Sequence, residues 1–396
     1  MKKMVAVYSV AFAAFLGPFS QSIYAPILSD VASYFNSPQL FVNASLSIYT
    51  FFLAIMQIVY GPLTDRFGPR KVLIPGVAIY IIASMGCYFS TSIYPFLIFR
   101  GIQASGIAVG TVASVAIIAE LCEGKQLGRA MGTYQMLVSL GPVLGPVFGG
   151  IIWGSFGYSA IISLLIALGA LALVLNAYFV KGNAVVKNAG GLKWSMIKNI
   201  VSNKIGISII SLGFIQYYTF FSFLVFYPMI LMERYGLTTV EKGLVFLPLS
   251  GCIVLGSFIG GKLAGKIRTP RFLIMISFLN VLAILISVGS LYISFYLTIV
   301  CSSAFGLCLG MSLPVQTIML SQEFLNERAT SVGIYNFFRF LGIAVSPVIG
   351  GFLYEKGNVL LLFGVISLIF CIIVCMIRLN FKKVQNGQKE VKQMIV

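Results

Sequence analysis

The stretch GPLTDRFGPRK, residues 61–71, separates two long apolar runs and indicates how the whole chain is organised. The run before it covers about residues 40–62, and the run after it covers about residues 72–91. Each run has about the 20 apolar residues that a helix needs to cross a bilayer. Glycines let two helix ends approach closely and turn sharply. The stretch therefore predicts a short polar loop between two membrane-crossing helices.

The rest of the chain has the same character. Of its 396 residues 59% are hydrophobic and 9% are charged, whereas a soluble chain carries about 25% charged residues. Only helices and closed barrels satisfy the backbone inside hydrocarbon, and the alternation typical of barrel strands is missing. We therefore predict an all-α polytopic membrane protein with twelve transmembrane helices, at about residues 5–30, 40–62, 72–91, 94–120, 129–152, 157–180, 205–232, 240–263, 272–290, 292–320, 329–353 and 358–378.

The charges predict the orientation of these helices. The chain has 27 Lys and Arg against 10 Asp and Glu, and the basic residues fall at both ends and in alternate loops. The exceptions are Arg234, Lys242 and Lys356 in the other loops, and Arg100 and Arg339 within apolar runs. This skew follows the positive-inside rule, so both termini are expected in the cytoplasm, and it explains the basic charge without nucleic acid.

The sequence also predicts how the helices are grouped. The longest polar stretch, residues 181–204, reads as a cytoplasmic basic linker between a six-helix bundle at 1–180 and another at 205–378, with a cytoplasmic tail at 379–396. Small residues repeat between the halves at offsets of about 200, for example Gly106 with Gly306. Such a repeat is typical of two bundles related by pseudo-twofold symmetry that rock about a central site.

Nothing in the composition predicts a cofactor or a metal. The chain has no histidine, and its seven cysteines lie almost entirely in apolar runs, where they read as small hydrophobic residues.

Residues 61–71 resemble the G-x-L-x-D-R-x-G-x-[RK]-[RK] loop of the major facilitator superfamily. The carboxylate of Asp65 can serve Arg66 or the N-terminus of a neighbouring helix. Residues 100–106, RGIQASG, are similar to the R-x-x-Q-G-x-G motif of that family, with Ala104 in place of one glycine. Residues 141–150, GPVLGPVFGG, fit the pattern that marks its drug:proton antiporters. The resemblance implies the family fold, alternating access, and conformational roles for Gly61, Asp65, Arg66, Gly68, Arg70, Gly141, Gly145, Pro146, Gly149 and Gly150.

Residues 18–26, PFSQSIYAP, resemble the P-x-x-x-D-x-Y-x-P segment of the Bcr/CflA type of drug exporter, and Ser22 stands at the position of its membrane-embedded aspartate. None of the ten acids lies near the middle of a predicted helix. Arg100 lies roughly 9 Å inside one, and the nearest acid along the first helix, Asp30, is roughly 12 Å further out. Because arginine stays charged, we expect Arg100 to face a watery cavity with neutral acceptors or a bound anion.

In the resembled family, helices 1, 4, 7 and 10 line the central cavity. The expected substrate-binding residues here are Gln21, Ser22, Tyr24, Arg100, Gln103, Tyr134, Gln135, Gln216, Tyr217, Gln316, Asn336 and Arg339. A structural alternative for Arg100 is a tether between helices 1 and 4 through Gln21 and Tyr24. For Arg339 the alternative is hydrogen bonding to backbone carbonyl groups.

A cavity with two cations and no acid favours a guest that carries carboxylate or phosphate. The predicted function is export of a small anionic or zwitterionic amphiphilic metabolite, for which an opine-type metallophore is one candidate. The expected partners are membrane lipid, the small-molecule substrate and protons, with Asp30 as the candidate proton carrier. We expect a monomer in a bacterial cell membrane.

Three alternatives belong to other classes. A multidrug:proton antiporter fits the same motifs. A channel fits less well, because the repeat and the Gly/Pro-interrupted helices favour rocking over a fixed pore. An intramembrane enzyme would need a nucleophile and a base within reach of each other, and this chain has no histidine and no mid-membrane acid.

Overall fold

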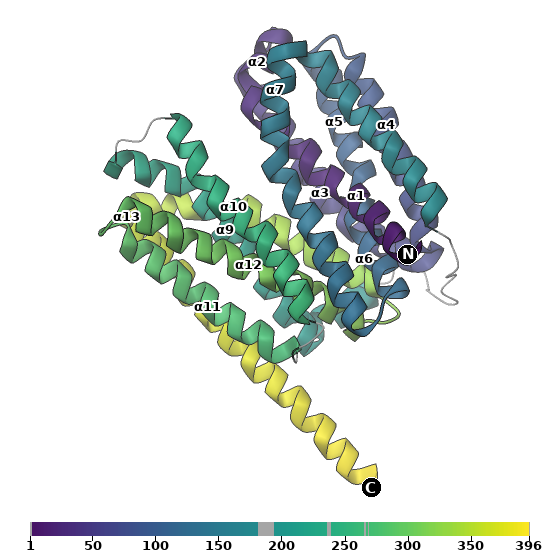
Figure 1. Ribbon diagram of the computed structural model, residues 1–396, viewed down its shortest axis with the longest axis vertical. Coiled ribbons are helices and arrows are strands. Elements are labelled where there is room, and N and C mark those ends of the chain that lie inside the picture. The colour runs from purple at the N-terminus through teal and green to yellow at the C-terminus, as the bar shows by residue number, and fades with distance from the viewer. Residues whose placement is uncertain (1, 181–193, 236–238, 265–266, 268, 396) are drawn as a thin grey trace. The chain divides into compact units, whose positions relative to one another are not determined.

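The computed structural model describes residues 2–180, 194–235, 239–264, 267 and 269–395 (Figure 1). Within these residues the chain is helical and no strand is present. The elements are α1 (Lys2–Ser22), the 3-10 helix η1 (Ala25–Ile27), α2 (Leu28–Tyr34), α3 (Gln39–Phe67), α4 (Pro69–Tyr88), α5 (Ile93–Ile107), α6 (Val109–Leu121), α7 (Gly124–Phe179), α8 (Trp194–Ser202), α9 (Lys204–Tyr235), α10 (Thr239–Ala264), α11 (Thr269–Ser290), α12 (Phe295–Glu323) and α13 (Arg328–Ile395).

The chain folds as two compact units. The first contains Met1–Lys193 together with Leu325–Gly333, and the second contains Trp194–Phe324 together with Ile334–Val396. The first part of the predicted linker, 181–193, lies outside the described residues, and the chain from Trp194 onward forms α8.

The described helices account for the predicted number of crossings. Eleven are long and apolar enough to span a membrane. One of them, α7, has 56 residues, which is too long for a single crossing at 1.5 Å per residue. It contains a break at Gly157, where φ is +72°, a conformation that favours glycine. Dividing α7 there brings the eleven spans to twelve, and the predicted all-helical class is confirmed.

Some predicted boundaries are wrong. The first apolar run, expected as one helix to about residue 30, is divided into α1, η1 and α2. Pro26 lies within η1, and its missing N–H group cannot continue the α-helical ladder. The last two runs lie within one helical element, α13, as two spans at Arg328–Tyr354 and Val359–Lys382.

Glycines set the distance between α1 and α7 in the first unit. A Cβ atom at Gly141 would lie 2.8 Å from the backbone nitrogen of Phe19, and one at Gly149 would overlap the carbonyl oxygen of Ile23. Because Gly141, Gly145 and Gly149 are four residues apart, they share one face of α7. This face allows the backbone of α1 to pack directly against it.

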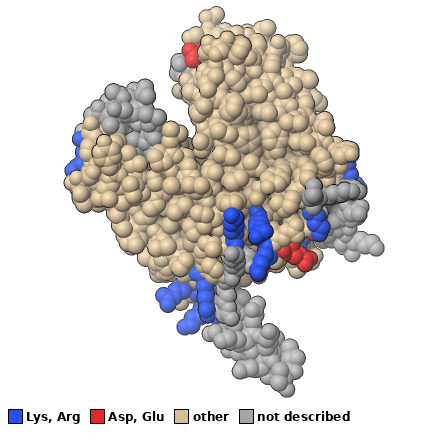
Figure 2. Space-filling view, viewed as in Figure 1, with Lys and Arg blue, Asp and Glu red and all other residues tan. Residues whose placement is uncertain are grey.

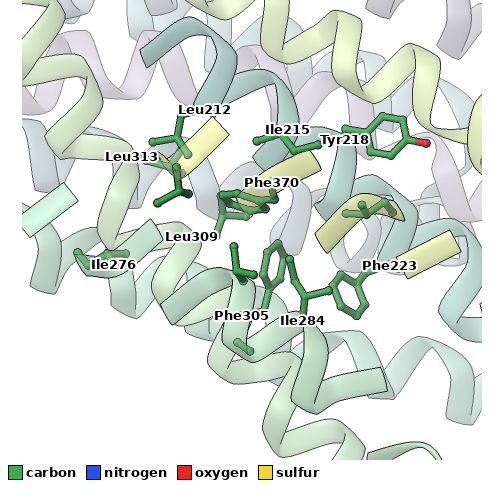
Figure 3. Close-up of a cluster of buried hydrophobic side chains, with 14 of the residues drawn as sticks. Leu212, Ile215, Tyr218, Phe223, Ile276, Ile284, Phe305, Leu309, Leu313 and Phe370 are labelled. Carbon is green, nitrogen blue, oxygen red and sulfur yellow. The ribbon is translucent and has the colours of Figure 1, made fainter. Parts of the chain in front are cut away.

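The second unit has an apolar core between its helices. Figure 3 shows side chains of α9, α11, α12 and α13 that point toward one another, among them Leu212, Ile276, Phe305 and Phe370. All four are completely buried. The surface is apolar as well, and most of the face in Figure 2 carries neither acidic nor basic side chains. Exposed aliphatic residues such as Ile82, Ile98 and Leu368 suit contact with lipid tails.

Candidate functional site

Arg100 lies at the centre of a polar cluster in the first unit. The side chain is 0% exposed, and its guanidinium carbon is 4.4 Å from the centre of the Tyr24 ring and 4.2 Å from that of Tyr49. Its Nη1 donates to the carbonyl oxygen of Ser20 at 3.2 Å and to Oε1 of Gln103 at 2.7 Å. Arg100 and Gln103 are three residues apart on α5 and therefore share a face of that helix.

The cluster continues from Gln103 through neutral groups. Gln103 donates from Nε2 to the Ser84 hydroxyl at 2.7 Å, and Ser84 donates to the carbonyl oxygen of Tyr80 at 2.7 Å. The hydroxyls of Tyr80 and Ser20 lie 2.7 Å apart. All of these side chains are fully buried. The chain of hydrogen bonds orients the amide of Gln103, so that its oxygen faces the cation.

The environment of Arg100 agrees with the expectations only in part. Its hydrogen-bond acceptors are neutral, as expected, but the side chain is fully buried beside the rings of Tyr24 and Tyr49 instead of facing a watery cavity. The alternative tether is correct for Tyr24 and wrong for Gln21, which donates to the Thr50 hydroxyl at 2.6 Å. Gln21 is three residues before Tyr24, and its side chain reaches α3 instead of α5.

Ser22 does not hydrogen-bond to Arg100 and instead donates to backbone carbonyl oxygens. Its hydroxyl is 2.8 Å from the carbonyl oxygen of Pro18 and 3.0 Å from that of Gly141. It therefore contributes to the packing of α1 against α7.

The contacts of Arg100 offset only part of the cost of burying its charge. Desolvated cation–π contacts contribute about 2 kcal/mol each, which is comparable to the insertion cost of about 2.5–3.5 kcal/mol for a mid-membrane charge. However, Nε and Nη2 of Arg100 are buried and have no hydrogen-bond partner among the described residues. A buried unpaired donor costs about 1–3 kcal/mol, and more when it is charged. The guanidinium therefore keeps two donor nitrogens that could bind an anion.

A second polar cluster joins three helices of the second unit. Gln316 donates from Nε2 to Oε1 of Gln216 at 2.8 Å, and Gln216 donates to the Ser312 hydroxyl at 2.9 Å. The Tyr335 hydroxyl donates to Oε1 of Gln316 at 3.0 Å. All four side chains are fully buried. Both expected glutamines are thus present in one cluster, but they bind each other instead of facing solvent.

Arg339 lies beside this cluster and is half-buried. Its guanidinium carbon is 3.9 Å from the centre of the Tyr217 ring and 5.2 Å from that of Tyr335. It donates to the Tyr217 hydroxyl, and to Oδ1 of Asn336 at 3.0 Å. Asn336 and Tyr335 are three and four residues before Arg339 on α13, so helical spacing brings them together. Three expected residues, Tyr217, Asn336 and Arg339, therefore form one cation-containing group.

Two further expected residues lie elsewhere in the first unit. Tyr134 is buried, and its hydroxyl donates to the carbonyl oxygen of Thr111 at 3.3 Å. Gln135 is buried as well, and its Nε2 has no partner among the described residues.

Asp65 binds the N-terminus of a helix, which is one of the two options that the sequence left open. Its carboxylate oxygens accept from the backbone N–H groups of Ala329 at 2.9 Å and Thr330 at 2.8 Å, and from the Thr330 hydroxyl at 2.6 Å. These residues form the first turn of α13, where backbone N–H groups have no partner within the helix. A Cβ atom at Gly61 would lie 2.7 Å from Cα of Thr330, so the glycine allows this approach.

The other loop residues shape the turn between α3 and α4. Gly68 has φ +90° and separates the two helices. Arg70 donates to the carbonyl oxygen of Ala177 at 2.8 Å, and Arg66 is exposed beside the ring of Phe67. The candidate proton carrier Asp30 is exposed in the first turn of α2.

Sequence reasoning missed several members of the clusters. Tyr49, Tyr80 and Ser84 surround Arg100, and Ser312 joins the two glutamines. The available signal was the helical spacing of Tyr80 and Ser84, and of Ser312 and Gln316, because residues four apart share a face. Which of the many tyrosines face inward depends on packing that periodicity alone does not give.

Comparison with known proteins supplies the family. The chain is 30% identical over 177 residues to the MFS antiporter QDR3 of Candida albicans, covering 45% of this chain and 25% of that protein. It is 26% identical over 270 residues to the multidrug resistance protein MdtM of Escherichia coli, covering 66% and 64% respectively. The matches thus span between a quarter and about two-thirds of these relatives' lengths. A crystal structure of the E. coli fucose:proton symporter FucP superimposes with a TM-score of 0.80 at 14% identity, covering 96% of this chain and 99% of that one.

The family model described as Major Facilitator Superfamily matches residues 10–292 and, separately, residues 209–393. The two matches overlap and together cover nearly the whole chain. The chain therefore belongs to the Major Facilitator Superfamily and is a multi-pass membrane protein.

Proposed function

We propose that this transporter is a secondary active exporter that works by alternating access and carries a small anionic or zwitterionic amphiphile. The observation that supports this proposal is the charge of the two clusters. Arg100 and Arg339 lie within membrane-spanning helices, and their hydrogen-bond partners described above are neutral. A cationic site of this kind favours a guest that brings the negative charge, and it disfavours lipophilic cations.

Arg339 is the better placed of the two for cargo. It is half-buried, whereas Arg100 is fully buried beside two tyrosine rings. A guanidinium can hold a carboxylate through two parallel hydrogen bonds. The ring of Tyr217 offers an apolar face to the rest of an amphiphile, and the amide of Asn336 offers hydrogen bonds. In this proposal Arg339, Tyr217 and Asn336 bind the cargo, and the network around Gln216 and Gln316 supports them.

Within this class, an opine-type metallophore is one candidate, because such compounds combine several carboxylates with an amino-acid skeleton. The test is a comparison of small molecules in the medium of three strains: a deletion strain, the same strain with the wild-type chain, and the same strain with Arg339→Gln. The proposal expects an anionic compound that disappears from the medium on deletion and returns only with the wild-type chain. An unchanged set of anionic compounds contradicts it.

We further propose that transport is coupled to protons, with Asp30 as the carrier. The support is that Asp30 is exposed at the start of α2, where it can exchange protons with water. In proteoliposomes, Asp30→Asn is expected to abolish the dependence of transport on a pH gradient while leaving counterflow of cargo intact. Gradient-driven transport that persists in this variant would refute the role of Asp30.

We propose that the chain lies in a bacterial cell membrane as a monomer with both termini in the cytoplasm. The basic alternate loops support the orientation of the termini. In this orientation Asp65 and the first turn of α13 lie on the cytoplasmic side, where their contact would favour one state of the transport cycle. A fluorescent protein fused to the C-terminus should fold and emit. An alkaline phosphatase fused at the same position should be inactive.

A multidrug:proton antiporter is the second candidate, and the names of the relatives from C. albicans and E. coli favour it. Ethidium efflux discriminates between the two functions. If the cargo is anionic, the wild-type chain exports ethidium poorly and Arg339→Asp improves the export. Strong wild-type efflux that collapses in Arg339→Asp supports the multidrug function instead.

A further inference from the structure

The guanidinium of Arg100 has one edge that makes no hydrogen bond to a described residue. The guanidinium carbon lies 4.4 Å from the centre of the Tyr24 ring and 4.2 Å from that of the Tyr49 ring. Nη1 is occupied by the carbonyl oxygen of Ser20 and by Gln103. The remaining donors, Nε and Nη2, are buried without a partner among the described residues.

These two donors are adjacent. In the planar guanidinium the N–H of Nε and one N–H of Nη2 lie along the same edge and point in the same direction. This fork is the one that arginine uses to hold an anion through two parallel hydrogen bonds. The hydroxyl of Tyr24, whose ring lies against the guanidinium, is also buried and unpartnered among the described residues. These two residues thus have three buried donor atoms without a partner, and the Tyr24 hydroxyl oxygen can accept as well as donate.

The enclosure limits the size of the anion. Arg100 is 0% exposed and Tyr24 is 1% exposed, so any anion must displace the surrounding side chains to reach the fork. A monatomic anion needs the smallest displacement. Neutral hydrogen-bond partners on the other side of the guanidinium leave its positive charge available to hold such an ion.

We propose that the free edge of Arg100 binds a small monovalent anion of the size of chloride, which stays in the first unit as a counter-ion. The site is separate from the cargo site proposed at Arg339 and does not depend on it. Arg339 also differs in kind, because it is half-buried and Tyr217 and Asn336 already accept hydrogen bonds from both of its Nη groups.

The test is the melting temperature of the purified full-length protein in detergent as chloride replaces gluconate at constant ionic strength. Gluconate is too large for the enclosed edge. The wild-type melting temperature is expected to rise saturably with chloride, because a ligand that binds only the folded state stabilises it. Arg100→Lys keeps the charge but lacks the fork, and its apparent affinity for chloride should fall about tenfold or more. The control Arg66→Lys, at an exposed arginine of the same unit, should keep the wild-type response.

A second measurement needs no variant. Wild-type crystals grown in bromide should give an anomalous peak within hydrogen-bond distance of Nε and Nη2 of Arg100. A wild-type melting temperature that is identical in chloride and gluconate would overturn the proposal. An ordered guanidinium whose free edge holds water, without anomalous signal, would also overturn it. Neither outcome concerns the anionic cargo, so the two proposals fail separately.

Discussion

Arg100 occupies a position of the family motif that the sequence identified. The sequence predicted only some of the side chains that surround it. A motif places an arginine three residues before Gln103 on one helix, and the structure joins the two by a hydrogen bond of 2.7 Å. The two tyrosine rings come from the turn after α1 and from α3, far away in the sequence. Their contribution depends on how these helices pack, which no motif specifies.

Gln103→Leu tests the importance of the neutral shell. The substitution removes an acceptor from a buried cation, so the free energy of unfolding should fall by about 1–3 kcal/mol. Gln135→Leu is the matched control, since Gln135 is equally buried in the same unit but its Nε2 has no partner. Melting curves of both variants in detergent measure the difference. Equal losses would contradict a special role for the Gln103 hydrogen bond.

Asp65→Asn tests the contact with the first turn of α13. The carboxylate accepts three hydrogen bonds, two of them from the end of a helix where negative charge is favoured. Neutralising it should lower the free energy of unfolding by about 1–3 kcal/mol. Asp30→Asn, at an exposed acid, should cost less than about 1 kcal/mol. If both variants melt alike, Asp65 does not stabilise the start of α13.

The sequence predicted which segments form helices better than it predicted where the helices begin and end. Runs of about 20 apolar residues gave the spans, since the bilayer fixes their length. Breaks within a run depend on single residues. Pro26 interrupts the first run, and Gly157 allows the turn that divides α7. Closely spaced glycines form a flat face on α7, and that face contacts α1.

Gly149→Ala tests this packing. Its Cβ atom would overlap the carbonyl oxygen of Ile23, which cannot move without α1. The overlap should destabilise the protein by about 1–3 kcal/mol. Gly150→Ala is the matched control, since nothing lies within 4 Å of its Cβ position. The control should be neutral or more stable by up to about 1 kcal/mol, because alanine favours helix. Thermal unfolding in the same detergent compares the two, and a stable Gly149→Ala would contradict the close approach of α1 and α7.

At the scale of the whole molecule, the composition and the repeat indicated a membrane transporter of two halves, and the family match agrees with this class. The sequence did not predict which residues are accessible to cargo. Several of the expected binding residues lie in buried networks, and others form one group around the half-buried Arg339. Gln216 and Gln316 satisfy each other, whereas Arg339 keeps partial exposure. Sequence patterns place polar residues on helices, but which of them remain accessible depends on the side chains that they meet.

The central claim, that the cargo is anionic and bound through Arg339, is tested most directly by charge selectivity in proteoliposomes. Three amphiphiles with the same skeleton would be compared, one with a carboxylate, one with its methyl ester and one with an amine in its place. We expect the wild-type chain to transport the carboxylate in preference to the others, and Arg339→Gln to reduce that transport about tenfold or more, since a charge-assisted bidentate contact is lost. Preferential transport of the amine by the wild-type chain, unchanged in Arg339→Gln, would contradict the claim.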